Sequence, residues 1–400
     1  MYHQVVIIGA GPVGGRLATE LASRGISTLM VEEHAEIGRP FQCAGLVNPS
    51  AMNMVNLQET ILQNVDGALI HSPSGIMVPV GKDGITRTHV VCRKRFDQGV
   101  VAQAMTAGAH LWLLAKPLEA NVTTSGVELK IEREGEILDV KCDLLIGADG
   151  AHSWTRRHFR LGRPKEMMIG FQTDVSGLTG KDNWLEMYTG NDIAPGLFAW
   201  VIPTGNNSHR IGVWSRAQDL DGRSVEQCYD ALLNHPLWKD RFAGVKEIAR
   251  YCGPVPCGVI PKPFKDRVMV IGDAAGMAKP TTGGGIGPGF RQVEAIIDNL
   301  VKAIQNGRLK SGDLATVCKP FKAFRKEQDR ARALRDLLVT TPDDEKLDSH
   351  FRMFNRPDIL ELINIEGDIE HPVPLGLTLL RKVPEFRKLA IKAGFKLLFA

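Results

Sequence analysis

The first segment that could do chemistry is a glycine-rich turn, Gly9-Ala10-Gly11-Pro12-Val13-Gly14. A pyrophosphate needs backbone N–H groups at close range and the positive end of a helix dipole. Gly9 permits a tight turn, Gly11 lets the backbone approach a phosphate, and Gly14 lets helix and strand pack closely. Glu32, followed by Glu33, ends the next apolar run, where a carboxylate can accept both ribose hydroxyls. The carboxylate disfavours a 2′-phosphate, so the pattern predicts FAD or NAD.

Two later turns have the same physical form, an apolar run that ends in aspartate beside glycine. Asp149-Gly150 follows the run at residues 144–146, and Gly272-Asp273 follows the run at residues 268–271. Glycine brings the backbone close to a ligand, and aspartate can accept a ribitol or ribose hydroxyl. Taken together and in this order, the three turns predict one nucleotide site built from distant parts of the chain.

The elements that must position these turns alternate in type. Residues 5–8 and 28–31 predict buried parallel strands around a helix at residues 16–24. Residues 68–78 predict a hairpin, residues 95–107 and 292–306 predict helices, and residues 167–258 predict short antiparallel strands broken by one helix near 225–233. From residue 314 onward the pattern is helical. We therefore expect an α/β fold whose Rossmann-type domain carries an inserted antiparallel-sheet domain and a helical C-terminal region.

This pattern also predicts the domain boundaries. We expect a discontinuous nucleotide-binding domain at residues 1–66, 90–165 and 258–310, and a substrate sheet domain at residues 67–89 and 166–257. Residues 311–400 should form the helical C-terminal region.

The three turns resemble the fingerprints of the FAD-dependent monooxygenase and reductase superfamily, which has a glutathione-reductase-like FAD domain. The stretch Val91-Cys92-Arg93-Lys94-Arg95-Phe96-Asp97 is similar to a conserved segment of the same superfamily. That resemblance implies that FAD is the cofactor and that Arg93 lies near its ribityl-phosphate portion.

Within the superfamily the chain most resembles the geranylgeranyl reductases, particularly the archaeal digeranylgeranylglycerophospholipid reductases. Residues 37–46, which contain Gly38-Arg39-Pro40 and Cys43-Ala44-Gly45-Leu46, match one family segment, and residues 280–286 match another with Gly283-Gly284-Gly285-Ile286. Pro195-x-x-Phe198-x-Trp200-x-Ile202-Pro203 resembles a third, although Phe198 stands where the family has tyrosine.

The resemblance implies roles for these residues. The FAD-binding residues would be Gly9, Gly11, Pro12, Val13, Gly14, Glu32, Glu33, Cys43, Ala44, Gly45, Arg93, Asp149, Gly150, Gly272, Asp273, Gly284, Gly285 and Ile286. Residues 283–286 would run under the isoalloxazine, Cys43 would deliver a proton, and Phe198, Trp200 and Pro203 would line a lipid slot.

The implied reaction is the hydrogenation of C=C bonds in geranylgeranyl chains of archaeal-type membrane lipids or related prenyl lipids. An isolated alkene has no carbonyl to polarise, so reduced FAD must supply the hydride while the protein holds the chain and excludes water. An alternative stays open, because Phe-x-Trp-x-Ile-Pro also resembles the W-x-W-x-I-P stretch of flavin-dependent halogenases. The alternative is a flavin monooxygenase or halogenase acting on an aromatic substrate.

Composition narrows the partners. The 400 residues carry a net charge of +4 and 24% charged residues, and no basic block with interleaved aromatics occurs in the first three hundred, which argues against nucleic acid. Seven cysteines without a CxxC motif argue against a disulfide framework or a metal cluster and indicate a reducing compartment. No second GxGxxG motif occurs, so we expect a transient electron donor, either ferredoxin or NAD(P)H.

The charge pattern of the tail bears on localisation. Residues 341–370 hold nine acidic and three basic residues, whereas residues 375–400 hold six basic residues and one acid among Leu, Ile and Phe. A basic amphipathic end can lie on an anionic membrane, but it can equally be a solvated face of a packed helix. No signal peptide or membrane span is apparent. We expect a cytoplasmic protein, with peripheral contact to the inner face of the cell membrane left open.

Overall fold

The computed structural model describes residues 1–40, 43–367 and 372–392. Its N-terminal unit is β1 (Tyr2–Ile8), α1 (Pro12–Ala22) and β2 (Thr28–Val31). β1 pairs in parallel with β2 on one side and with β11 (Glu136–Gly147) on the other. Residues 5–7 are completely buried, as expected for a strand covered on both faces. The predicted β-α-β unit is confirmed.

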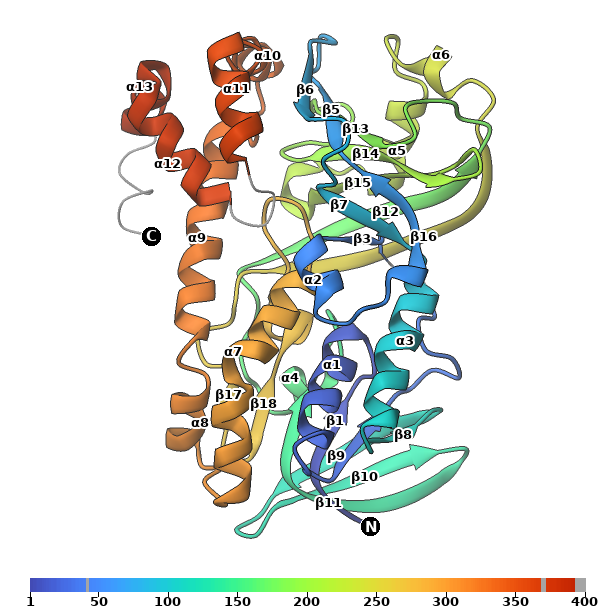
Figure 1. The fold of residues 1–400 in the computed structure, drawn as a ribbon, viewed down its shortest axis with the longest axis vertical. Helices are drawn as coiled ribbons and strands as arrows, with labels where there is room; N and C mark the ends of the chain where they lie inside the picture. The colour runs from blue at the N-terminus through green and yellow to red at the C-terminus, as the bar shows by residue number, and fades with distance from the viewer. Residues whose placement is uncertain (41–42, 368–371, 393–400) are drawn as a thin grey trace.

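The first sheet, at the bottom of Figure 1, has the strand order β17-β18-β11-β1-β2-β8. β18 (Val268–Val270) and β8 (His110–Trp112) continue the parallel pairing. β17 (Phe264–Lys265), β10 (Val127–Arg133) and β9 (Ala115–Val122) add antiparallel neighbours at its edges. Because β1, β11 and β18 run in the same direction, their carboxyl ends, which carry the three glycine turns, meet at one edge.

The second sheet has seven strands in the order β16-β12-β15-β14-β13-β5-β6. Neighbours are antiparallel except β13 and β5, which are parallel, and β5 and β6 form the hairpin that the sequence predicts. The bounds are β16 (Lys246–Cys257), β12 (Glu166–Ser176), β15 (Ser208–Arg216), β14 (Phe198–Gly205), β13 (Trp184–Tyr188), β5 (Gly67–His71) and β6 (Met77–Gly81).

A small third sheet lies between the two, with the order β3-β7-β4. Its strands are β3 (Leu46–Val47), β7 (Thr88–Val91) and β4 (Ile61–Val65). The short helices are α2 (Pro49–Asn53), α4 (Trp154–His158), α5 (Val225–Leu233) and α6 (Lys239–Phe242). α5 confirms the helix predicted near residues 225–233, and it begins with a Ser224–Gln227 capping box. The prediction of one helix in the antiparallel block missed the short α6 that follows it.

Two long helices begin earlier than the sequence pattern indicates. α1 starts at Pro12 rather than residue 16, and α7 (Ile286–Gln305) starts at residue 286 rather than 292. In both helices a proline, Pro12 or Pro288, occupies the first turn, where its missing N–H costs nothing. α3 (Arg93–Thr106) likewise begins two residues before the predicted start. The spacing of apolar residues shows only which part of a helix is buried. A first turn made of glycine and proline has no such spacing, so its position is missed.

In the described residues from 311 onward, the C-terminal region consists of helices joined by short connections. It contains α8 (Ser311–Val317), α9 (Phe321–Leu338), α10 (Asp344–Phe354), α11 (Pro357–Glu366), α12 (Pro372–Lys382) and α13 (Pro384–Lys392). In Figure 1, α9 lies beside α7 and leads up to α10 and α11, which lie next to β6 of the upper sheet, while α12 and α13 lie farther out. Part of the basic tail, residues 393–400, lies outside the described residues. Over the part of the chain that the structure describes, no helix is both long and apolar enough to cross a bilayer.

A buried ion cluster fastens α9 to the start of the second sheet. The carboxylate of Glu166 on β12 accepts from Nε of Arg332 at 2.8 Å and from Nη2 of Arg335 at 2.8 Å. Burial alone would raise the pKa of Glu166, but the guanidinium groups of Arg335 and Arg332 outweigh it and lower this pKa to about 2. The cluster therefore stabilises the fold only while Glu166 is ionised.

We expect Glu166→Gln to weaken the acid sensitivity of folding. A depressed folded-state pKa adds stability that is complete above the unfolded pKa near 4.5 and is lost as the pH falls toward about 2. At about 1.4 kcal/mol per pKa unit, the difference in unfolding free energy between wild type and variant should be about 2 kcal/mol smaller at pH 3 than at pH 7. Urea unfolding at both pH values measures it, with the exposed Glu128→Gln as control. An equal difference at both values would contradict the assignment.

Candidate functional site

The glycine turn between β1 and α1 divides into positions that the protein fills and one that it leaves open. Gly9 has φ +96°, and an added Cβ there would lie 2.5 Å from the carbonyl oxygen of Ala148. A Cβ at Gly14 would overlap the carbonyl oxygen of Gly9. At Gly11 no atom of the described chain lies within 4 Å of the same position. Gly9 and Gly14 are thus required by packing, whereas Gly11 borders a space that fits a phosphate group.

The two carboxylates after β2 face different surroundings. Glu32 accepts a hydrogen bond from the backbone N–H of Ala10 at 3.0 Å, so its carboxylate lies beside the glycine turn. Its other oxygen contacts Nδ1 of His34 at 2.6 Å. Glu33 is 60% exposed, and its one ion pair reaches His34 at 4.0 Å. The geometry favours Glu32 as the group that would meet a ribose.

The second turn uses its aspartate internally. Asp149 accepts from Oγ of Ser153 at 2.5 Å and from the N–H and hydroxyl of Thr155 at 2.8 and 2.9 Å. Burial raises the pKa of Asp149, and these hydrogen bonds oppose that rise. The carboxylate therefore holds the turn, and Gly150, with φ +67°, has open space at its Cβ position.

Arg156 joins the second turn to the third. Its guanidinium donates to the carbonyl oxygen of Ala151 at 2.7 Å and to that of Ala274 at 2.9 Å. Val13, in the first turn, packs against Gly272, where a Cβ would lie 3.2 Å from its side chain. The structure therefore brings all three predicted turns together, although they lie more than 100 residues apart.

Asp273 and Arg93 form the charged part of the site. Arg93 is bidentate to Asp97, with N–O distances of 3.1 and 2.8 Å. Burial alone would lower the pKa of Arg93, but Asp97 and Cys43 together raise it, so the guanidinium stays charged. Burial raises the pKa of Asp273 to about 6, and the charge of Arg93 limits that rise. The pair places one permanent cation and one readily protonated carboxyl beside the turns.

The loop from residue 281 to residue 285 completes this site. Gly283 has φ +72° and lies against the indole of Trp214, and Gly285 caps α7 close to Asp273. Oγ1 of Thr281 and Oγ1 of Thr282 are buried with no hydrogen-bond partner within the described chain. Since buried hydroxyl groups are normally satisfied, these atoms are consistent with a ligand against the loop.

A cavity of about 810 Å³ starts at this loop and is lined mainly by apolar side chains. The part of the cavity beside this loop, which we call its inner end, is lined by Cys43, Ala44, Thr282, Gly283 and Gly284. Of the predicted slot residues, Phe198 and Trp200 line the cavity, and Pro203 does not. Ile202, part of the same matched segment, also lines the cavity. Further lining residues that sequence reasoning missed are Leu46, Val65, Ile70, Val80, Arg87, Leu185, Met187, Trp214, Val255, Ile363 and Leu375.

The segment around Cys43 is fixed to the second sheet by polar contacts. Arg210 donates to the carbonyl oxygen of Ala44 at 2.8 Å, and an added Cβ at Gly45 would overlap the guanidinium of Arg210. Trp200 Nε1 donates to Gln172 at 3.1 Å, and Gln172 donates to the carbonyl oxygen of Cys43 at 3.5 Å. Phe41 and Gln42, within the matched segment, lie outside the described residues.

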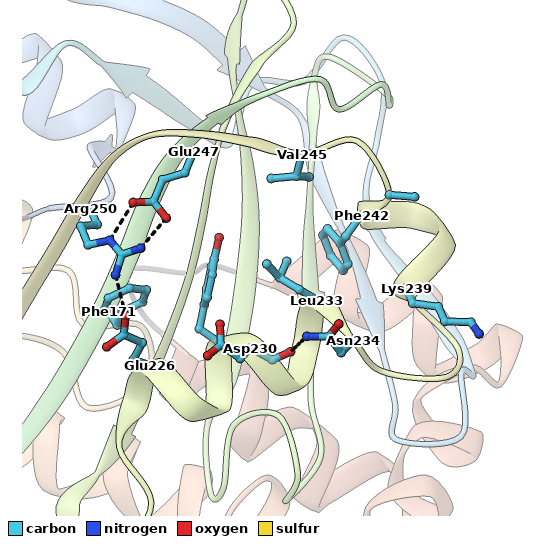
Figure 2. A pocket seen from close by; sticks show the side chains of 12 residues that line it. Phe171, Glu226, Asp230, Leu233, Asn234, Lys239, Phe242, Val245, Glu247 and Arg250 are labelled. Carbon is cyan, nitrogen blue, oxygen red and sulfur yellow. Dashed lines mark hydrogen bonds and ion pairs between the residues drawn. The ribbon is translucent and has the colours of Figure 1, made fainter.

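A second cavity, of about 440 Å³, lies between α5, α6 and the first residues of β16 (Figure 2). Its polar side chains pair with one another, since Arg250 binds Glu247 at 2.7 and 2.9 Å and Glu226 at 2.6 Å. None of the predicted site residues lines it. The predicted site residues that line a cavity therefore lie at the larger one.

Comparison with known proteins agrees with this geometry. The profile of the FAD binding domain family matches residues 2–314. A digeranylgeranylglycerophospholipid reductase of Methanococcoides burtonii is 33% identical over 299 residues, 71% of each chain. The chain belongs to the geranylgeranyl reductase family of FAD-dependent oxidoreductases.

Solved structures show the same fold. A geranylgeranyl bacteriochlorophyll reductase-like protein from Thermoplasma acidophilum has a TM-score of 0.85 at 24% identity, over 98% of this chain and 99% of that one. A flavin-dependent brominase has a TM-score of 0.73 at 17% identity, over 97% and 100%. Membership of this family confirms three predictions made from the sequence: the fold class, FAD as the cofactor, and the class of FAD-dependent oxidoreductases.

Two glycine substitutions should separate packing from cofactor contact. We expect Gly11→Ala to leave the melting temperature of the FAD-free protein within about 2 °C of wild type, because the added methyl meets no protein atom. Its FAD dissociation constant should rise at least about tenfold, about 1.4 kcal/mol, because the methyl enters the phosphate space. Gly14→Ala should instead destabilise the FAD-free protein. Differential scanning fluorimetry and FAD titration measure both quantities, and unchanged FAD affinity in Gly11→Ala would contradict the placement.

Proposed function

We propose that this protein hydrogenates C=C bonds in geranylgeranyl chains of archaeal-type membrane lipids or related prenyl lipids. The observation that carries the proposal is the apolar cavity of about 810 Å³ that begins at the Cys43 and Gly283–Gly284 backbone. A long hydrocarbon fits such a lining, whereas a small polar substrate would lose its hydrogen bonds to water there and gain few in return. The name of the Methanococcoides burtonii relative supports this substrate class.

The residues proposed to hold FAD follow from the geometry. The turns at Gly9–Gly14, Gly150 and Gly272 would cradle the pyrophosphate and ribityl portions, and Glu32 would accept the ribose hydroxyls. Arg93 would balance the phosphate charge, and residues 283–286 would support the isoalloxazine. Bound and reduced, FAD supplies the two electrons of the reduction.

The protein's contribution is to hold the alkene and exclude water. Phe198 packs edge-to-face on Trp214 with ring centroids 5.6 Å apart, and Trp214 in turn contacts Gly283. This aromatic wall continues the loop into the slot, so a chain lying along it would pass the inner end. An immobilised alkene needs little further ordering before it reacts, and a dry lining protects the reduced cofactor from side reactions.

Cys43 is proposed to deliver the proton. It lines the inner end of the cavity, where a thiol could reach an alkene carbon. Its interactions with Arg93 and Arg210 place positive charge nearby, which would stabilise the thiolate left after proton transfer. A proton taken up from solvent would then regenerate the thiol.

The partners follow from the same site. The electron donor would bind transiently, and ferredoxin and NAD(P)H are both compatible with the chain. We propose a cytoplasmic location with peripheral contact to the inner face of the membrane, because a membrane lipid must reach the slot. Neither nucleic acid nor a metal ion has a role in this scheme.

The direct test is anaerobic. We expect the dithionite-reduced protein, mixed with a geranylgeranyl-bearing glycerophospholipid, to yield products heavier by units of two hydrogens while the flavin spectrum returns to the oxidised form. Mass spectrometry and absorbance follow both, and a fully saturated phytanyl lipid, which cannot accept hydrogen, is the control. A reduced flavin that ignores the lipid but inserts oxygen into an aromatic acceptor in air would instead establish the monooxygenase alternative.

Cys43→Ser tests the proton donor. We expect turnover to fall at least about tenfold, about 1.4 kcal/mol, while lipid affinity changes less than twofold, because the side chains have the same shape and different acidity. Cys318→Ala, remote from the slot, serves as the cysteine-loss control. Full turnover by Cys43→Ser with the prenyl substrate would remove this role.

A further inference from the structure

Helix α9 contacts the backbone that leads into the loop at residues 281–285. Gln328 is buried, and its amide makes four hydrogen bonds. Its oxygen accepts from the N–H groups of Gly258 and Val259, each at 3.1 Å. Its nitrogen donates to the carbonyl oxygens of Met277 at 2.8 Å and Ala278 at 3.3 Å. The side chain therefore joins two separate backbone segments.

Arg335 makes the corresponding contact two helical turns later. Its Nη1 donates to the carbonyl oxygen of Pro280 at 2.9 Å, and its remaining donors bind Glu166 and Asp336. The side chain is 2% exposed. Residues seven apart lie on nearly the same face of a helix, so α9 presents Gln328 and Arg335 to the loop as a single surface.

Every carbonyl between residues 277 and 280 is consequently paired. Gln328 donates to the carbonyls of Met277 and Ala278, and Arg335 donates to the carbonyl of Pro280. The carbonyl of Lys279 accepts from the N–H of Gly283 at 2.9 Å, and the N–H of Lys279 donates to the carbonyl of Gly284 at 3.1 Å. Because buried backbone groups must be satisfied, the loop has little freedom to shift on the α9 side.

We propose that Gln328 and Arg335 are positioning residues that fix the loop at residues 281–285 for the flavin ring. The inference rests on the proposed function only in taking this loop as the isoalloxazine support. Both residues lie beyond residue 314, where the match to the FAD binding domain family ends. The C-terminal helical region is thus a working part of the cofactor site rather than an appendage.

Two substitutions remove the contacts, and the first of them does so with almost no change in volume. Gln328→Glu keeps an acceptor for Gly258 and Val259 but places carboxylate oxygen against the carbonyls of Met277 and Ala278. Arg335→Gln removes the donor to Pro280. Lys326→Gln, exposed on the same helix, is the matched control. Arg335→Lys keeps a cation that can reach Pro280, so it should recover part of the effect.

The first readout uses FAD-free protein and needs no substrate. We expect hydrogen exchange at the Lys279 and Gly283 amides to accelerate at least tenfold in Gln328→Glu and Arg335→Gln, and to stay within twofold in Lys326→Gln. Amides of β1 should keep their protection in all variants. Unchanged exchange at Lys279 and Gly283 in Gln328→Glu and Arg335→Gln would overturn the proposal. So would an equal loss of protection in β1, in these two variants and in Arg335→Lys.

The second readout is ligand affinity. We expect the FAD dissociation constant to rise at least tenfold in the two variants, and that of ADP, which has no flavin ring, to stay within twofold. Equal weakening of FAD and ADP would overturn the positioning role, since it would indicate a general loss of the nucleotide fold. A wild-type protein that binds FAD but reduces no prenyl lipid would refute the proposed function and leave this inference intact.

Discussion

The rest of the site depends on the close approach of three strand ends. β1, β11 and β18 run parallel, and their carboxyl ends meet so tightly that backbone touches backbone. A side chain at Gly9 would strike Ala148, and one at Gly14 would strike Gly9. Arg156 then locks the second and third ends together through two carbonyl oxygens. Open space remains beside Gly11 and Gly150 at this edge, so a pyrophosphate could approach the backbone there.

The slot is a consequence of how two sheets are joined. The second sheet contributes the aromatic wall, and the loop before α7 contributes the inner end, so neither unit alone forms the cavity. The Cys43 segment crosses between them and is held by Arg210 and Gln172, both from the second sheet. Chemistry at this junction can therefore combine a rigid nucleotide site with an apolar enclosure, while the two cores remain separate.

The three turns and the elements around them could be predicted because their signals are local. A β-branched run followed by glycine and an amphipathic helix specifies a β-α-β unit within about 30 residues. Phe198 and Trp200 could be predicted from an alternating aromatic pattern matched to a family segment. The starts of α1 and α7 were misplaced, since glycine and proline in a first turn carry no apolar period.

Other features left no local signal. Trp214, Met187 and Ile363 line the slot from three distant elements, and each reads in sequence as an ordinary core residue. Asp149 is predicted to accept a ligand hydroxyl, but the sequence did not show that its carboxylate also accepts from Ser153 and Thr155, contacts that depend on the turn of its own loop. The tertiary arrangement decides both cases.

The C-terminal region shows why a domain boundary drawn on sequence can divide a working unit. Its helical pattern predicts a boundary after the nucleotide-binding domain. Gln328 and Arg335 nevertheless donate to carbonyls of residues 277–280, about fifty residues earlier in the chain. Farther along, Ile363 and Leu375 line the same slot. Because one continuous segment touches both the loop and the slot wall, a shift of α9 would alter the cofactor support and the shape of the slot together. Under the proposed function, this arrangement would couple flavin placement to the fit of the hydrocarbon.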